Sequence, residues 1–528
     1  MRFIGILGLF VFLLLGVIFS KHRKAIKPRT IVWGFSLQLL FAIIILGKSV
    51  LSWVGMYIFC VLIVIYIFER QLATLNHRPK QVFFTGSAFI LSLIVITATV
   101  FLSTLQLGSF LFIALLGAYL LFRILNKTSV CRYFAGILLF SGLGLLIHHN
   151  VSGKVIFRLL AEKVDGFLKL ADLGSIFLFG NLAKPEYYDQ FGFQFAFSVL
   201  PTIIFFSAVM SIFYYLGIMQ VLIKVMAKFM KWTMRTSGAE TLSCSANIFV
   251  GQTEAPLLIR PFLNDMTPSE LHAIMVGGFA TIAGGVLAGY IRIGVDASHL
   301  IAASVMSAPA ALMMAKLFYP EIQKSKTAGN VEMPKTDRAD NLLDAAAKGV
   351  TDGLKLAVNV GAMLLAFIAI VGLLDKILGF FDQMVDQQLL GGAFNQIRGE
   401  YKGIFPGSMK TLLGTLFSPL AFLMGVPWKD ALQVGNLLGI KVAVNEFVAY
   451  AELAKYINNE ALSSRAVTIS TYALCGFANF SSIGIQLGGI GALVPHRRSD
   501  LSKVVLRAMF AGALASWMTA TIAGLLIE

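Results

Sequence analysis

Long apolar runs separated by short polar clusters dominate this chain of 528 residues. A helix that crosses a bilayer needs about 20 consecutive, mostly apolar residues. Runs of that length fill the first third of the chain, at approximately residues 3–20, 29–48, 50–68, 81–105, 108–126 and 131–149. We expect each of them to form a transmembrane helix.

Basic residues collect after every second run, and they set the expected orientation. The clusters are 21–27, Arg70 with 77–80, and Arg123 with Lys127 and Arg132. Short loops rich in Lys and Arg stay on the cytoplasmic side of a membrane. We therefore expect these loops inside and the N-terminus outside. Positive charge follows the first run and no small-residue cleavage site is present, so we expect a retained helix rather than a signal peptide.

Two segments between residues 150 and 240 have charged and apolar residues at helical spacing. Residues 154–173 predict an amphipathic helix in the outer interface of the membrane. A span is expected at about 192–216. Basic residues between 224 and 235 predict a second amphipathic helix, on the cytoplasmic side.

The most unusual stretch is residues 247–257, where Gln252, Thr253 and Glu254 stand together in apolar surroundings. Polar groups at membrane depth are costly unless they face a protein-enclosed or watery cavity. The segments on either side are too short to cross a bilayer. We expect two half-length helices that meet at a polar tip, which is a re-entrant hairpin of the kind that forms transporter sites. A polar loop at the membrane surface is the alternative.

The span after this hairpin is expected to break. It covers about 267–290, begins with a predicted capping box at Thr267 and Glu270, and is interrupted by a glycine-rich segment at 278–285. Another span at 297–319 and a polar cytoplasmic linker at 324–338 follow.

The second half of the chain repeats this order of elements. We expect an amphipathic stretch at 341–352, a span at 354–375, an interfacial region at 377–425, a second hairpin at 431–450, a broken span at 465–490 and a last span at 502–526. Residues 278–281 are Gly-Phe-Ala-Thr and residues 476–479 are Gly-Phe-Ala-Asn. Inverted repeats of this kind, with a site where they meet, are typical of secondary transporters. Chance similarity of short Gly-Ala motifs is the alternative.

The predicted fold class is an all-α polytopic membrane protein with inverted repeats. It contains two re-entrant hairpins, two broken transmembrane helices and about 12 transmembrane helices altogether. The expected divisions are an N-terminal region with four extra spans (1–150), an interfacial helix, span and amphipathic helix (151–237), a first hairpin repeat of the transport domain (238–320), a linker, scaffold span and interfacial region (321–430), and a second hairpin repeat (431–528).

Composition supports a membrane protein and excludes other classes. The chain is 57% hydrophobic and only 13% charged, whereas a soluble domain is about 25% charged. The net charge of +16 comes from clusters between apolar runs, so we attribute it to membrane orientation and expect no nucleic-acid partner. The four cysteines are far apart and fit no zinc spacing.

Several long motifs resemble those of the concentrative nucleoside transporter family. They are residues 21–25, 214–220, 247–257, 272–290, 445–450 and 472–485, and the resemblance covers roughly 1–48 and 140–528. The four predicted spans between about 50 and 130 depart from bacterial members. The resemblance implies a multi-pass homotrimer of the plasma membrane, or of the inner membrane of a bacterium. Each protomer would carry nucleoside and a cation across in an elevator-type mobile domain.

The polar residues of these motifs suit a nucleoside. Gln252 and Thr253 offer amide and hydroxyl groups to a base edge. Glu446 can accept two ribose hydroxyls in charge-assisted hydrogen bonds, and Asn479 and Ser482 can complete the contacts with the sugar.

The resemblance implies a matching substrate site. It places Gln252, Thr253 and Glu254 near the base, and Glu446, Asn479 and Ser482 near the ribose.

Phe477 is a further candidate for binding the substrate, and Phe477, Glu254, Ser482 and the nearby Lys441 also have simpler alternative roles. Phe477 can offer an aromatic face to the base or close the pocket, or it can be a core residue. Glu254 can hold the hairpin by pairing, and Lys441 can pair with a carboxylate or extend its charge to the membrane surface. Ser482 can serve helix packing alone.

Asn247 and Thr281 are the candidate cation ligands because both occur where helices are expected to break. Sodium prefers hard oxygen ligands, and broken helices supply carbonyls beside side-chain oxygens. The resemblance implies a sodium site made from the side chains of Asn247 and Thr281 and the carbonyls of Val250 and Ile282. We expect sodium as the coupling ion and no other cofactor, although some relatives couple to protons.

The predicted function is import of nucleosides such as uridine by a sodium-coupled symporter. An enzyme is not expected, since the sequence has no nucleophile elbow, HExxH motif or P-loop. A proton-coupled nucleoside symporter, a channel and a transporter of another hydroxylated solute remain alternatives.

Overall fold

The computed structural model describes residues 2–69, 78–125, 128–327, 339–396 and 398–527. These residues are almost entirely helical, as the sequence predicted. They form two compact units, one of residues Met1–Gln38 with Ala161–Glu528 and one of residues Leu39–Leu160, which are described separately. Most of the predicted polar linker, residues 328–338, and part of the basic loop at 70–80 lie outside the described residues.

The smaller unit contains the extra spans. Its helices are α3 (Ser49–Ile67), α5 (Arg78–Thr104), α6 (Gly108–Ile124) and α7 (Thr128–His148), together with the end of α2 (Pro28–Leu46) and the start of α8 (Gly153–Leu168). Helix α7 packs against α3, α5 and α6. Hydroxyl groups form hydrogen bonds between these helices. The Tyr57 hydroxyl lies 2.8 Å from Ser92 Oγ, and Thr99 Oγ1 donates to Ser141 Oγ at 3.3 Å. These bonds satisfy polar groups that lipid would leave without partners.

The larger unit begins with α1 (Arg2–Ile18), the turn η1 (Arg23–Ala25) and the start of α2. The predicted amphipathic segment at 154–173 is α8 (Gly153–Leu168) followed by α9 (Ala171–Phe179). Short turns come next, namely η2 (Gly180–Ala183), η3 (Pro185–Tyr187), α10 (Tyr188–Phe191) and α11 (Phe195–Ser198). They lead to α12 (Leu200–Tyr215) and to α13 (Ile218–Met234), which is the second predicted amphipathic helix.

The first hairpin has two arms of different geometry. Helix α14 (Gly238–Ala246) is α-helical, whereas the returning arm η4 (Ala255–Asp265) is a 3-10 helix. Capping boxes start α14 at Ser237 and Glu240 and start α15 (Pro268–Ala280) at Thr267 and Glu270, and the second of these was predicted.

The break in the following span is shorter than the sequence suggested. Helix α15 continues to Ala280 and α16 (Gly284–Arg292) begins four residues later. Gly278 therefore lies inside a helix and not in the break. A Cβ atom at this position would come within 2.8 Å of Gln252 Cβ, so close packing with the hairpin tip accounts for this glycine.

The second half also differs from the expectation in one place. After α17 (Ala297–Phe318), the stretch and the span predicted separately at 341–352 and 354–375 form one helix of 41 residues, α18 (Leu342–Asp382). Its glycines serve helix packing: a Cβ on Gly349 would lie 2.6 Å from Ala208 Cα, and one on Gly353 would lie 2.8 Å from Ile204 Cα. Small residues of this kind let α18 approach α12 closely.

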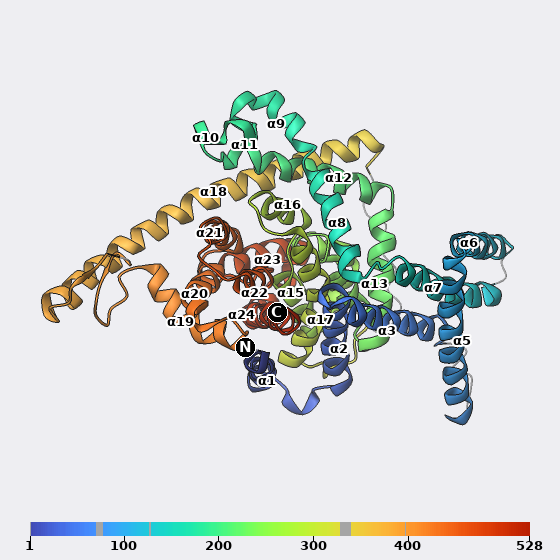
Figure 1. Cartoon of the computed structure of the whole chain (residues 1–528). Helices are drawn as coiled ribbons and strands as arrows, with labels where there is room; N and C mark the ends of the chain where they lie inside the picture. The colour runs from blue at the N-terminus through green and yellow to red at the C-terminus, as the bar shows by residue number, and fades with distance from the viewer. Residues whose placement is uncertain (1, 70–77, 126–127, 328–338, 397, 528) are drawn as a thin grey trace. The chain divides into compact units, whose positions relative to one another are not determined.

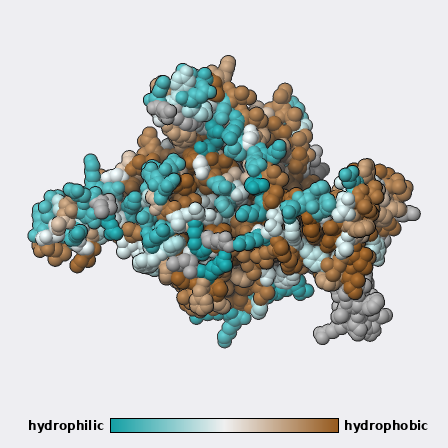
Figure 2. Space-filling model, in the orientation of Figure 1, coloured by the Kyte–Doolittle hydropathy of each residue, from teal (hydrophilic) through white to brown (hydrophobic). Residues whose placement is uncertain are grey.

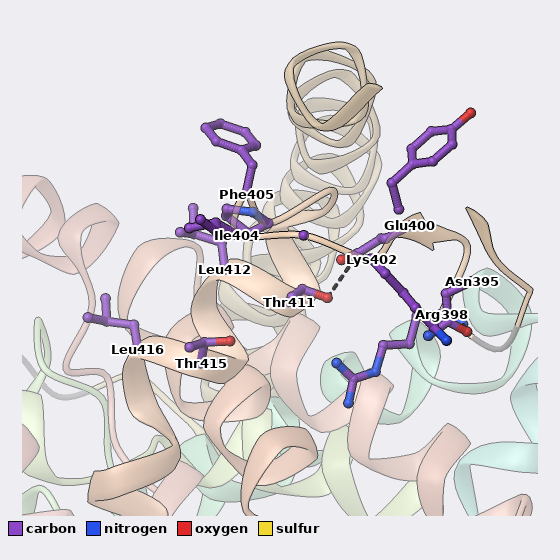
Figure 3. A pocket seen from close by; sticks show the side chains of 13 residues that line it. Asn395, Arg398, Glu400, Lys402, Ile404, Phe405, Thr411, Leu412, Thr415 and Leu416 are labelled. Atoms are coloured by element: carbon purple, nitrogen blue, oxygen red, sulfur yellow. Dashed lines mark hydrogen bonds between the residues drawn. The ribbon is translucent and has the colours of Figure 1, made fainter. Parts of the chain in front are cut away.

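The segment after α18 is a compact loop organised by carboxylates. It contains the π-helical turn η5 (Gln383–Leu389) and the strands β1 (Phe394–Asn395) and β2 (Glu400–Tyr401). Asp386 accepts the backbone N–H groups of Ile404 and Phe405 at 3.0 and 2.9 Å. Glu400 accepts the hydroxyl of Thr411 at 2.6 Å, as Figure 3 shows. A cavity of about 630 Å³ lies beside this loop, and no predicted site residue lines it.

The remaining helices form the second repeat. Helices α19 (Met409–Leu423) and α20 (Trp428–Ala443) are bent by 117° at their junction. They are followed by α21 (Glu446–Asn458), α22 (Ser464–Leu474), α23 (Phe480–Leu493), η6 (Pro495–Arg497) and α24 (Arg498–Leu526). The predicted second hairpin is thus α20 and α21 with their turn at 444–445, and the predicted broken span is α22 and α23 with the break at 475–479.

Within the described residues of both units, nine helices are long and apolar enough to cross a membrane, or up to ten if the bent pair is counted as one span.

Helices of the larger unit divide into buried and exposed ones. Helices α15, α17 and α22 pack around α24 and are mostly buried (Figure 1). By contrast, α18 exposes apolar side chains along its length, and apolar residues cover broad areas of the surface in Figure 2. Lipid can cover such a surface, and polar side chains can be concentrated in the buried helices.

A buried ion pair joins the base of the first hairpin to α17. Lys316 Nζ lies 2.6 Å from Glu240 Oε2 and donates to Ser269 Oγ at 2.9 Å. Glu270, on α15, accepts the hydroxyl of Ser325 at 2.6 Å. These bonds connect the starts of α14 and α15 with the end of α17.

We expect Lys316→Met to destabilise the protein strongly, because it leaves the Glu240 carboxylate buried without its cation. Removing one partner of a buried pair costs about 3–5 kcal/mol. The matched control is Lys326→Met, which breaks an exposed pair with Asp265 and should cost less than about 1 kcal/mol. Thermal unfolding of the purified protein in detergent measures both, and equal shifts for the two variants would contradict the prediction.

Candidate functional site

The two broken helices meet at their breaks. Phe477 N donates to Thr281 O at 3.2 Å, which joins the break between α22 and α23 to the end of α15. Gly476 has a φ of +142°, and a Cβ there would lie 2.8 Å from Phe279 O. Glycine is therefore needed both for the backbone conformation and for the close approach. The first hairpin joins the same junction because Gly284 N donates to Phe249 O at 3.2 Å.

Glu446 lies at this junction, at the first position of α21. The Tyr290 hydroxyl donates to Glu446 Oε1 at 3.0 Å, and Asn479 Nδ2 donates to Oε2 at 2.9 Å. The side chain is buried, and Asn445 caps its helix by accepting Val448 N at 2.9 Å. A carboxylate has about four acceptor positions, so these two bonds orient Glu446 and leave it able to accept further donors.

Asn479 is oriented by the helix that it caps. Its Oδ1 accepts Ser482 N and the Ser481 hydroxyl, each at 2.8 Å. Because a backbone N–H can only donate, Oδ1 must face the start of α23, and Nδ2 then faces Glu446. The cap of α23 and the orientation of Glu446 therefore depend on one side chain.

Gln252 connects the tip of the first hairpin to the same helix. Its Nε2 donates to Ser482 Oγ at 3.2 Å, and its Oε1 accepts Gln486 Nε2 at 3.0 Å. Gln486 also donates to Met275 O at 3.1 Å. A continuous set of hydrogen bonds thus runs from α15 through the hairpin tip and α23 to Glu446.

Three predicted substrate-binding residues stand outside this set of bonds. Thr253 packs with its methyl group against α23, since a Cβ on Gly489 would lie 2.7 Å from it. Phe477 is buried and contributes its backbone N–H to the junction. Glu254 accepts the N–H of Gly251 in its own hairpin turn, so in this structure it holds the tip.

The candidate cation ligands lie at two helix ends. Asn247 follows the last residue of α14, and Thr281 follows the last residue of α15. Both reach Gly277: Thr281 Oγ1 donates to its carbonyl at 2.8 Å, and a Cβ on Gly277 would lie 3.2 Å from Asn247 Nδ2. The Val250 and Ile282 carbonyls belong to the hairpin turn and to the break.

The Asn247 amide tests whether these residues fit a cation. It is completely buried, and neither its oxygen nor its nitrogen has a partner within the described part of the chain. Buried polar groups are nearly always satisfied, and helix C-terminal ends attract positive charge. An unsatisfied oxygen between two such ends fits sodium, whose preferred ligands are neutral and anionic oxygens.

Lys441 neither pairs with a described carboxylate nor extends to the surface. Its side chain is completely buried, and Nζ donates to Ala473 O at 2.7 Å. Ala473 is in the last turn of α22, so the ammonium group caps the negative end of that helix.

Two residues of the junction were not predicted, namely Tyr290 and Gln486. Both are completely buried. Gln486 is a single long polar side chain in the apolar run of α23, four residues after Ser482. That spacing places both on one helix face and was a usable signal. Tyr290 gave no such signal, because buried tyrosines are common in apolar helices.

Models of known protein families match much of the chain. Three family models match the chain: one described as Na+ dependent nucleoside transporter N-terminus at residues 7–64, one as nucleoside recognition at 196–297, and one as Na+ dependent nucleoside transporter C-terminus at 299–524. They leave 65–195 unmatched, which includes most of the extra spans.

Solved structures decide the family. CNTnw in an outward-facing state is 32% identical with a TM-score of 0.72, and the alignment covers 99% of this chain and 97% of that one. CNTnw in an inward-facing substrate-bound state is 33% identical, also with a TM-score of 0.72, over 100% and 98%. The chain belongs to the concentrative nucleoside transporter family. The family consists of multi-pass membrane transporters rather than enzymes, as the sequence predicted.

Curated relatives are longer than this chain. Sodium/nucleoside cotransporter 1 of Rattus norvegicus is 46% identical over 399 residues, which are 73% of this chain and 58% of that protein. The Homo sapiens protein of the same name is 45% identical with the same coverage. Solute carrier family 28 member 3 of Eptatretus stoutii is 44% identical over 74% of this chain and 56% of its own length. The chain therefore matches less than two thirds of the length of these relatives.

We expect Asn247→Ala to abolish stabilisation by sodium, because it removes the unsatisfied oxygen between the ends of α14 and α15. An ion that binds only the folded state stabilises it by about 2.7 kcal/mol at 100 times its Kd. The melting temperature of the purified protein, titrated with sodium against choline, measures this effect.

The control for this prediction is Asn436→Ala. Asn436 is also buried and has an unsatisfied oxygen, but it lies on α20. A sodium-dependent shift that survives in Asn247→Ala would show that the ion binds elsewhere.

Proposed function

We propose that the protein is a sodium-coupled symporter that imports nucleosides such as uridine. The observation that carries this proposal is the buried carboxylate of Glu446, held by Tyr290 and Asn479 at the junction of the two broken helices. The similarity to relatives named sodium/nucleoside cotransporters supports it.

The chemistry of the two ends of the site matches the two parts of a nucleoside. Glu446 offers acceptors, which suit the hydroxyl donors of ribose. Gln252 and Ser482, at the other end, suit a base edge and a ribose oxygen. Gln252 Nε2 donates to Ser482 Oγ at 3.2 Å, which leaves the second N–H of Gln252 and the Ser482 hydroxyl proton available to a nucleoside.

Sodium and nucleoside would be coupled through the first hairpin. The Val250 carbonyl is two residues before Gln252, and Asn247 is at the end of the preceding helix. An ion held by these groups and Thr281 fixes the hairpin turn against the break after α15. The turn then presents Gln252 in its binding position, so each ligand raises the affinity for the other.

Transport would proceed by alternating access of an elevator type. CNTnw is known in outward-facing, intermediate and inward-facing substrate-bound states. In this chain the buried helices α15, α17, α22 and α24 would carry the site, while exposed helices such as α18 would face lipid and neighbouring protomers. We propose a homotrimer in the plasma membrane, with the N-terminus outside.

Replacing Glu446 by Gln should reduce uridine uptake about 10- to 100-fold, because hydrogen bonds to a charged group contribute about 1.5–3 kcal/mol. Uptake into sealed proteoliposomes at subsaturating uridine measures the effect. Glu452→Gln is the matched control on the same helix, since Glu452 forms a partly exposed pair with Lys455 and should retain uptake. Undiminished uptake by Glu446→Gln would refute the proposed site.

The ion is tested by imposing one gradient at a time on the same vesicles. We expect an inward sodium gradient to drive uridine accumulation above equilibrium and a proton gradient alone to leave it at equilibrium. Accumulation that follows the proton gradient and ignores sodium would overturn the sodium assignment but not the nucleoside site. Accumulation of glucose in place of uridine would overturn the substrate class.

A further inference from the structure

The contacts of Gln486 determine the direction of its side-chain amide, that is, which neighbour faces the nitrogen and which faces the oxygen. A glutamine side chain has a donor end and an acceptor end, and these are assigned from their partners. Gln486 Nε2 lies 3.1 Å from Met275 O. A backbone carbonyl can only accept, so the donor end of Gln486 must point toward α15. The side chain is completely buried, so water cannot replace either of its protein partners.

The orientation of Gln486 determines that of Gln252. The same Nε2 lies 3.0 Å from Gln252 Oε1. If Gln252 were reversed, two amide nitrogens would face each other and neither could accept. Gln252 must therefore point its oxygen at Gln486 and its nitrogen toward Ser482, at 3.2 Å.

The nearby glycine makes this contact possible. A Cβ on Gly278 would lie 2.7 Å from Gln486 Nε2 and 2.8 Å from Gln252 Cβ. Any side chain at this position would push the two amides apart. The helix α15 thus supplies both the carbonyl that orients Gln486 and the space in which the two glutamines meet.

We propose that Gln486 is a positioning residue for substrate selection: it holds Gln252 so that only hydrogen-bond donors face the nucleobase. An amide nitrogen carries two N–H groups, and Ser482 Oγ uses one of them. The remaining N–H requires an acceptor on the base, either a carbonyl oxygen or an unprotonated ring nitrogen. Ser482 accepts from Gln252, so its own hydroxyl proton is directed onward as a second donor. This inference rests on the proposed function.

The requirement separates nucleosides that share a ribose. Uridine has a carbonyl at position 4 and an N–H at position 3, whereas cytidine has an amino group at position 4 and an unprotonated nitrogen at position 3. At position 4 only uridine has an acceptor, and at position 3 only cytidine has one. A donor that is held opposite one of these positions therefore pairs with only one of the two nucleosides. An amide that is free to rotate can offer its oxygen instead, and it then selects between uridine and cytidine less strongly or with the opposite preference.

The test compares uridine and cytidine uptake by Gln486→Leu, which cannot donate to Gln252. The ratio of the two uptake efficiencies, Vmax/KM in sodium-driven proteoliposomes, should change at least about fivefold from the wild type, the size expected for one mismatched hydrogen bond. Gln486→Asn retains the amide but is one methylene shorter, and it should change the ratio in the same sense. It also replaces Gln486→Leu if that variant does not fold.

A double-mutant cycle shows whether Gln486 acts through Gln252. In a Gln252→Ala background, Gln486→Leu should leave the uridine-to-cytidine ratio unchanged, because the oriented amide is already absent. The matched control is Gln38→Leu. Gln38 is another completely buried glutamine, it donates to Gly34 O at 3.4 Å, and its oxygen has no partner in the described part of the chain. That variant should keep the wild-type ratio.

Two results would overturn the proposal. One is a fall in overall uptake by Gln486→Leu with an unchanged ratio, which would mean that Gln486 only supports packing. The other is the same change of ratio with and without Gln252. Failure of the proposed function looks different, since the wild-type protein would then accumulate neither nucleoside.

Discussion

Helices that break inside a membrane leave backbone groups without their usual partners, and the core of this protein is arranged around the two places where that happens. Water cannot satisfy these groups at depth, so protein must. Here the two breaks provide hydrogen-bond partners for each other, since Phe477 N donates to Thr281 O. The first hairpin adds Phe249 O, which accepts the first N–H group of α16. The polar side chains of the site belong to the same system. Asn479 and Asn445 cap helices that begin at the turns, and the caps also orient the groups around Glu446.

The two repeats treat their helix C-terminal ends differently. Such ends carry partial negative charge. In the second repeat, the ammonium group of Lys441 donates to Ala473 O at the end of α22. In the first repeat, Asn247 and Thr281 stand at the ends of α14 and α15, and the Asn247 amide has no described partner. One repeat thus contains its positive charge as a side chain. Under the proposed function, the other takes it from a sodium ion, which makes that half of the junction dependent on the ion gradient.

The division between buried and exposed helices gives the site its surroundings. Helices α15, α17 and α24 are buried by their neighbours, and α18 exposes most of its surface. Ionisable groups are then confined to places where protein can satisfy them, such as the pair of Lys316 with Glu240 at the base of the first hairpin. Helix α12 contacts α18 closely through Gly349 and Gly353, and the Ser211 side chain of α12 donates to the backbone of α18 at Ala345 O.

The sequence by itself determined most of the elements. Apolar runs set the spans because a bilayer requires about 20 such residues, and Thr267 with Glu270 marked the start of α15 because a capping box is a local interaction. It also singled out Gln252, Glu446 and Asn479, since polar groups are rare and costly in such runs, and the structure brings these three to one junction. It misplaced the interruption near Gly278 and divided α18 in two, because a glycine has the same appearance in a break as in a close helix contact.

Only the tertiary structure decided which polar groups meet. Gln252 and Gln486 are separated by 234 residues in the chain, and Tyr290 and Glu446 by 156, so no local pattern could pair them. The direction of each amide depends on a backbone group of another helix, such as Met275 O for Gln486. Glu254 accepts the N–H of Gly251 in its own hairpin turn and takes no part in the hydrogen bonds between the repeats described above. Contacts of this kind exist only once the two repeats have packed together.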